Sequence, residues 1–77
     1  MKEAFTKIIK SIILPEYEII SYVMVGLANR SRFQVYYKIP PRTHKDIIRK
    51  IEETTHDLFK MLSLNNDYTL AVWFDYD

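Results

Sequence analysis

The fold is decided by the stretch YEIISYVMVGLA, which occupies residues 17–28. It is rich in Ile, Val and Tyr, which suit a pleated backbone, and it therefore predicts a β-strand. Its odd positions include Val23 and Val25, and its even positions include Ile20, Tyr22 and Met24. Because side chains alternate between the two faces of a strand, both faces of this strand are apolar. Such a strand normally lies inside a sheet with both faces covered, so we expect it to be the central strand.

Downstream of this strand the sequence predicts a hairpin. The turn at residues 29–31 (NRS) is short, and asparagine tolerates left-handed backbone. Residues 32–39 then alternate between apolar and mainly polar side chains, with one side formed by Phe33, Val35, Tyr37 and Ile39. This pattern is typical of a half-buried strand at an edge. Pro40 and Pro41 end it, because proline has no N–H to donate to the sheet.

Two amphipathic segments predict helices. Residues 2–14 place isoleucines at the spacing of one helical face, and Pro15 is expected to end that helix by disfavouring helical backbone at the preceding residue. Thr43 predicts the N-cap of the second helix, with Asp46 at the third helical position as a variant of the capping box. The second helix should run to about Leu64 with a single apolar stripe.

A last strand is predicted at residues 68–76, so the elements form one α+β domain over residues 1–77 in the order α-β-β-α-β. The third strand can pair beside the first strand or beside the second. We expect a three-stranded sheet of order 2-1-3, because the doubly apolar first strand suits the centre. Each helix has one apolar stripe, so we expect both helices on one face; the alternative is a three-layer arrangement with the first helix on the opposite face.

Composition narrows the class of protein. The 77 residues include no cysteine and 2 histidines, so a small core has neither disulfides nor thiolate metal sites to support it, and self-association is the support that remains. The net charge of +1 gives no strong attraction to nucleic acid or to an anionic membrane. No apolar run approaches the roughly 20 residues of a membrane span, so we expect a cytoplasmic protein. Abundant isoleucine with little glutamine or cysteine fits a thermophilic source.

With both helices on one face, the other face of the sheet should stay open. It is expected to carry Ile20, Tyr22, Met24, Tyr36 and Trp73. Isoleucine and methionine in mid-strand are poor choices for contact with water, and tyrosine and tryptophan are common anchors of interfaces. We therefore predict a homodimer through this open face, since closed two-fold dimers are the commonest oligomers. The alternative is a monomer whose strands are merely amphipathic.

A second hypothesis assigns the same face to single-stranded nucleic acid, RNA in particular. Aromatic side chains on a sheet surface stack on unpaired bases in several RNA-binding modules. Arg30, Arg32 and Lys38 would then contact phosphates. The single glycine excludes a GXXG loop, and the aromatic-plus-glycine signature of ribonucleoprotein motifs is absent. Self-association is therefore the preferred hypothesis.

No motif predicts catalysis, a cofactor, a metal or a small-molecule substrate. Glu53 and His56 have the spacing of half a di-metal motif, but the chain lacks the second half. We expect His44 to cover an edge of the core, and the Thr55 hydroxyl to bond the carbonyl of Ile51. A phosphate-binding loop or dinucleotide fingerprint needs several glycines. We therefore expect a non-enzymatic interaction protein.

Overall fold

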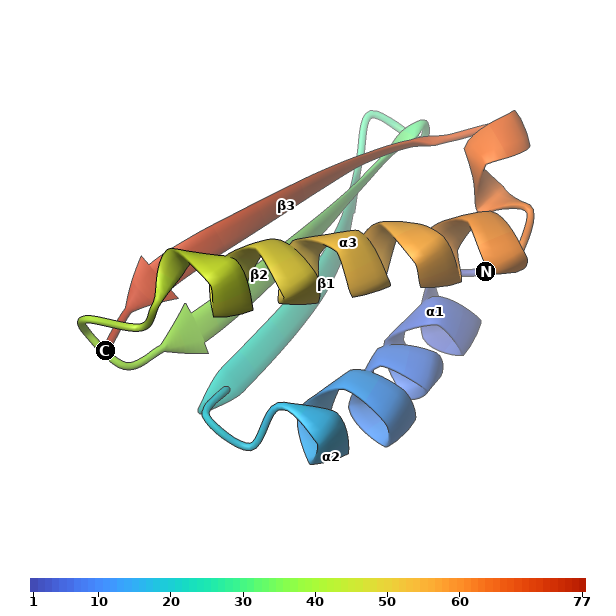
Figure 1. The fold of residues 1–77 in the computed structure, drawn as a ribbon. Helices are drawn as coiled ribbons and strands as arrows, with labels where there is room; N and C mark the ends of the chain where they lie inside the picture. Colours follow the sequence, from blue (N-terminus) through green and yellow to red (C-terminus); the bar gives the residue numbers. More distant parts are fainter.

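The computed structural model describes all 77 residues as an α+β domain in which helices are layered on a three-stranded mixed sheet (Figure 1). The elements are α1 (Lys2–Ile8), η1 (Ile9–Ile13), α2 (Leu14–Glu16), β1 (Tyr22–Ala28), β2 (Arg32–Ile39), α3 (Lys45–Met61), η2 (Leu64–Asn66) and β3 (Thr69–Tyr76). The α-β-β-α-β order expected from the sequence is confirmed. No helix combines the length and the apolar character that crossing a membrane requires.

The sheet has the order β1-β2-β3, so the predicted order 2-1-3 is wrong. β1 and β2 form an antiparallel hairpin, and β3 pairs in parallel with β2. The inward side chains of β2 are all at 0% exposure, namely Phe33, Val35, Tyr37 and Ile39, whereas Leu27 at the end of β1 is 43% exposed. A central strand needs only one apolar face when the other face of the sheet is uncovered. The strictly alternating strand therefore lies at the centre, and the doubly apolar strand lies at an edge.

α1, η1 and α2 form one continuous helix from Lys2 to Glu16 (Figure 1). Pro15 does not end it, contrary to the prediction: Leu14 keeps helical backbone (φ −61°, ψ −43°), and the chain departs from it only at Tyr17 (φ −115°, ψ 78°). The reason is the π-helical turn η1, in which the N–H of Leu14 donates to the carbonyl of Ile9. The wider turn gives the proline ring room against the preceding residues, and proline has no N–H that needs an acceptor.

Two of the regular elements are shorter than predicted, α3 at its end and β1 at its beginning. α3 ends at Met61 because Ser63 adopts left-handed backbone with φ 59°. β1 begins only at Tyr22, because the residues before it form a turn in which the N–H of Ile20 donates to the carbonyl of Tyr17 at 3.1 Å. Both deviations arise at segment ends, where hydrophobic pattern alone specifies little.

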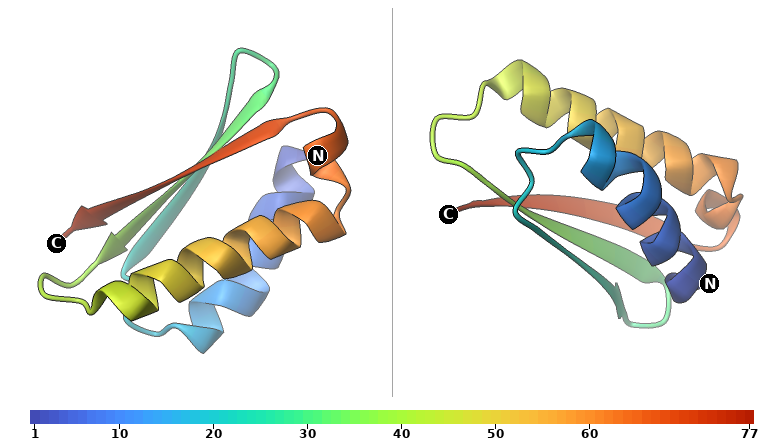
Figure 2. Two further views of the ribbon diagram at one scale, coloured as in Figure 1. Left: turned by 45° about the horizontal axis from the view of Figure 1, so that its top comes forward. Right: turned by 90° about the horizontal axis from the view of Figure 1, so that it is seen from below.

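The core is organised around a cluster of three phenylalanines. Phe5 of α1, Phe33 of β2 and Phe59 of α3 pack edge to face with ring centroids 5.5 or 5.6 Å apart. Each such pair contributes about 0.5–1.5 kcal/mol beyond its buried area. Since Phe5 and Phe59 both contact Phe33, both helices reach the same side of β2, and Figure 2 shows them together on one face of the sheet. We call this the helical face.

One buried polar pair lies within the helical face. The Thr55 hydroxyl donates to the carbonyl of Ile51 at 2.7 Å, which confirms the prediction for Thr55. The Tyr37 hydroxyl lies 2.7 Å from Thr55 Oγ1 and therefore donates to it. Burial raises the pKa of Tyr37 to about 12. Every buried side-chain nitrogen and oxygen has a partner, so the helical face closes without a polar defect.

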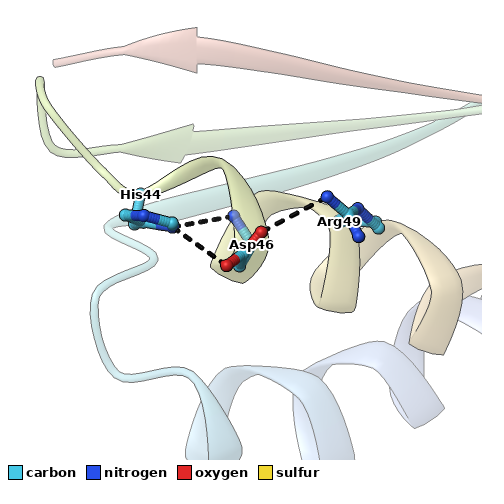
Figure 3. A network of polar contacts seen from close by, with 3 residues as sticks. All are labelled: His44, Asp46 and Arg49. Atoms are coloured by element: carbon cyan, nitrogen blue, oxygen red, sulfur yellow. Dashed lines mark hydrogen bonds and ion pairs between the residues drawn. The ribbon is translucent and has the colours of Figure 1, made fainter.

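α3 begins one residue later than predicted. Its N-cap is His44, whose Nδ1 accepts the N–H of Asp46 at 3.1 Å (Figure 3). Thr43 was the expected cap, but its hydroxyl donates to the carbonyl of Pro40 at 2.6 Å. Because Thr43 is engaged in the turn that follows β2, the imidazole takes the capping position, and His44 does not cover the core as expected.

Candidate interface on the open sheet face

The face of the sheet opposite the helices is not covered by any segment of the chain (Figure 2). We call it the open face. The strand register orders its side chains into rows that run across the sheet. From one end to the other, the rows are Tyr22–Lys38–Asp75, Met24–Tyr36–Trp73, Gly26–Gln34–Ala71 and Ala28–Arg32–Thr69. The row of a side chain therefore determines which other side chains lie beside it on the open face.

The second row is an apolar band that spans all three strands. Met24 and Trp73 are 46% and 48% exposed, and Tyr36 between them is half-buried. The rings of Tyr36 and Trp73 stack with an interplanar angle of 12° and a centroid distance of 6.0 Å. Tyr36 is thus flanked by Trp73 on one side and by Met24 on the other. We call Met24, Tyr36 and Trp73 the apolar band.

Beside the apolar band lies the row Gly26, Gln34 and Ala71, whose members on the two edge strands are small; we call it the small-residue row. A Cβ atom built on Gly26 would meet nothing within 4 Å, so the glycine is not required by contacts inside the chain. Glycine in a strand interior weakens the strand, and it often marks a place where another group approaches closely. On the two edge strands, the open face therefore steps down from the apolar band to the small-residue row.

The basic residues of the nucleic-acid hypothesis are dispersed on this surface. Lys38 shares the end row with Asp75, which offsets its charge, and Arg32 lies in the row at the opposite end. The six-residue separation along β2 corresponds to about 20 Å. Arg30 lies outside the sheet in the β1–β2 turn, with left-handed backbone at φ 62°. These three cations do not form one basic strip beside the aromatic rings.

Of the five residues predicted for the open face, the structure brings together Tyr22, Met24, Tyr36 and Trp73, but not Ile20. Ile20 precedes β1, is 9% exposed and belongs to the hydrophobic core, so its placement on the open face is wrong. The turn that precedes β1 breaks the two-residue periodicity on which the prediction relied.

Sequence reasoning placed the apolar band on one face but missed that its members share a row. The hairpin could have revealed half of this row, because a three-residue turn at 29–31 sets Ala28 opposite Arg32 and hence Met24 opposite Tyr36. Trp73 joins the row only through the parallel pairing of β3 with β2. That register depends on the length and placement of α3, which carry no comparable local signal.

The polar side chains at the start of α3 and the charged side chains on the N-terminal helix are exposed. His44, Asp46 and Arg49 form a small network in which Arg49 Nη2 lies 3.3 Å from Asp46 Oδ1, with all three side chains 60–65% exposed (Figure 3). A shallow surface depression on the N-terminal helix is lined only by polar side chains, Lys2, Glu3, Thr6, Lys7 and Lys10. No group of three or more His, Cys, Asp or Glu side chains is arranged to hold a metal ion. The open face, with its exposed apolar band, is thus the candidate functional surface.

No protein-family model, no curated protein and no solved structure matches the chain.

Proposed function

We propose that this protein is a small non-enzymatic interaction module in which two copies associate through their open faces. The observation that supports this proposal is the half-exposed apolar band of Met24, Tyr36 and Trp73 lying directly beside the small-residue row. Large apolar side chains in mid-strand gain free energy when a partner removes them from water. Tryptophan and tyrosine are also the residues most often found as anchors of interfaces.

A second copy suits this surface because the surface is complementary to itself. The two copies can be related by a two-fold axis that lies in the plane between their open faces. This axis runs perpendicular to the strands, midway between the apolar band and the small-residue row. The rotation sets Met24 above Gly26 of the second copy and Trp73 above Ala71 of the second copy, so a large side chain meets a small one on both edge strands, while Tyr36 meets Gln34 on the central strand. Lys38 then faces Arg32 of the second copy at the rim, where Asp75 and solvent ions reduce the repulsion.

The size of the open face sets the strength of the association. Three strands of this length present about 300 Å² of projected area per copy. Two copies therefore cover about 600 Å² of projected area in total, which is a small contact for a protein interface. We expect a reversible dimer in the micromolar range or weaker, strengthened by moderate salt that screens Lys38 and Arg32.

The arrangement favours a second copy over single-stranded nucleic acid. A base needs a free ring face to stack on. Tyr36 is flanked by Trp73 and Met24, and the nearest cation, Lys38, shares its row with Asp75. The apolar band and small-residue row of a second copy fit these features better than a phosphate backbone does.

The test is the solution mass by light scattering, from low micromolar to submillimolar concentration, for the natural chain and for Trp73→Lys. We expect the natural chain to become dimeric or larger with concentration, and Trp73→Lys to reach a smaller mass than the natural chain at the same concentration. Tyr76→Lys is the matched control, because Tyr76 is also an exposed aromatic of β3 (59%) but lies with the inward-facing parity of that strand. Equal masses for the natural chain and Trp73→Lys would contradict the proposal. A monomeric natural chain that binds a single-stranded RNA oligomer through Trp73 would favour the nucleic-acid hypothesis instead.

A further inference from the structure

β1 lies at an edge of the sheet although its sequence is that of a central strand. None of its seven residues, YVMVGLA, is charged or proline. Charged residues and prolines are the usual protection of natural edge strands against pairing with another chain. The other edge strand, β3, contains Asp75 and is followed directly by Asp77. The two edges of this sheet therefore differ, and β1 is the unprotected one.

The backbone of β1 has free hydrogen-bonding groups along that edge. In an antiparallel pair, the N–H and C=O groups of alternate residues point away from the neighbouring strand. β2 is the only strand that pairs with β1, and no backbone hydrogen bond from a turn, loop or cap involves residues 22–27. Figure 2 shows the N-terminal helix in the helical layer, so no segment continues the sheet beyond β1. The outward-pointing groups of residues 22–27 have no partner within the chain.

We propose that the β1 strands of two copies pair edge to edge, antiparallel about Val25, so that two three-stranded sheets join into one continuous sheet with both β1 strands at its centre. This arrangement would give β1 the central position that its doubly apolar sequence suits. It is isologous, since the same strand contributes from both copies, and it closes after two chains.

Pairing about Val25 matches the side chains on both faces. On the open face, Met24 lies opposite Gly26 of the second copy, and Tyr22 lies opposite Ala28 of the second copy, so a large side chain meets a small one each time. On the helical face, Val25 meets its own counterpart, and Leu27 meets Val23 of the second copy. Leu27 is 43% exposed in the single chain and gains an apolar cross-strand neighbour. The occupant is a second copy because YVMVGLA complements itself in this register.

This inference goes beyond the proposed function, because it uses the backbone edge of β1 and not the side chains of the open face. The two modes are geometrically compatible. The edge-pairing axis is perpendicular to the sheet at the level of Val25, and the axis between open faces lies in the interface plane at that same level. Two-fold axes that cross at a right angle generate a closed tetramer. Two joined sheets meeting face to face also cover about 1,200 Å² of projected area, twice that of two single sheets, and a larger contact suits a more stable interface.

The test uses the absence of cysteine from the chain, because any disulfide then reports an introduced residue. In Val25→Cys the two symmetry-related cysteines face each other with Cα atoms about 4.5–5.5 Å apart, which a disulfide can bridge. Val72→Cys is the matched control, because Val72 lies in the same row on the opposite edge strand. We expect mild oxidation to convert most of Val25→Cys, but little of Val72→Cys, into a covalent dimer. Equal yields from the two variants would overturn the edge pairing.

A second variant keeps the inference testable if Val25→Cys folds poorly. Leu27→Lys adds a charge to the edge at an exposed position, and we expect it to halve the mass reached by the natural chain at submillimolar concentration. Met61→Lys is its control, because Met61 is an exposed apolar residue (77%) on α3. An unchanged mass for Leu27→Lys would count against the edge pairing.

The solution masses and the yields of covalent dimer show which of the two proposals fails. If only the edge pairs, Trp73→Lys keeps the natural mass and Val25→Cys still forms the covalent dimer. If only the open faces associate, Trp73→Lys becomes monomeric, whereas Leu27→Lys keeps the natural mass and Val25→Cys resembles Val72→Cys. If both hold, the natural chain reaches a tetramer, and Trp73→Lys and Leu27→Lys each stop at a dimer.

Discussion

The two faces of the sheet are built from the same three strands but differ in how their side chains are used. On the helical face, Phe33 and Tyr37 are at 0% exposure, and the polar atoms there are paired. On the open face, Met24 and Trp73 remain nearly half exposed. This difference teaches that the residues that stabilise the fold and the residues that the proposed association would use lie on opposite sides of one sheet. Substitutions on the two faces should therefore change different measured quantities.

The largest expected effect is loss of stability on the helical face. Phe59→Ala removes one ring of the phenylalanine cluster and should lower the free energy of unfolding by about 3–5 kcal/mol. A single core of this size supplies only about 3–5 kcal/mol in total, so much of this variant should be unfolded. Trp73→Ala should cost less than about 1 kcal/mol in the monomer. Urea denaturation at low protein concentration compares the two, and similar losses would remove the distinction between the faces.

An intermediate effect is expected from Tyr37 at high pH. The unfolded chain releases the tyrosine proton near pH 10, whereas folded Tyr37 holds it to about 12. Between these pH values the unfolded state binds fewer protons than the folded state, so the free energy of unfolding falls as pH rises. The total fall is up to about 2–3 kcal/mol. Below about pH 10 Tyr37 is protonated in both states, and it adds no pH dependence to the stability. Urea denaturation from pH 9 to pH 12 measures this slope.

The neighbouring tyrosine on the open face provides the control for this prediction. Tyr37→Phe should lose about 1 kcal/mol at neutral pH with the hydrogen bond to Thr55, and its stability should fall less steeply above pH 10 than that of the natural chain. Tyr36→Phe keeps the pair of Tyr37 and Thr55 and serves as the matched variant. An identical alkaline slope in the natural chain and Tyr37→Phe would show that Tyr37 titrates normally.

The smallest effect is expected outside both faces, at the start of α3. His44→Ala removes the acceptor for the N–H of Asp46 and should cost about 0.5–1 kcal/mol, while His44→Asn, which can also cap, should restore most of it. His56→Ala is the control, because His56 lies inside α3. Thermal unfolding followed by circular dichroism measures these differences, and a loss in His56→Ala as large as that in His44→Ala would argue against a specific capping role.

Much of the face assignment could be predicted from the sequence, because it depends on local periodicity. The alternation in β2 correctly separated Phe33, Val35 and Tyr37 from Tyr36, and the helical spacing correctly predicted the bond from Thr55 to Ile51. The assignment failed for Ile20, since a turn interrupts the strand period there. It also failed at Pro15, because a π-helical turn relieves the clash that normally ends a helix at proline.

The sequence by itself determined which segments are helices and strands and, for most residues, which side chains share a face, because these properties follow from neighbours two to four positions apart. Only the tertiary structure decided that β2 is central, that β1 is an edge, and that Met24, Tyr36 and Trp73 share one row. Strand order depends on contacts between distant segments, and the pattern of β1 alone favoured the centre. The physical reason is that an apolar pattern specifies that a strand needs to be covered, but does not specify whether the cover comes from its own chain.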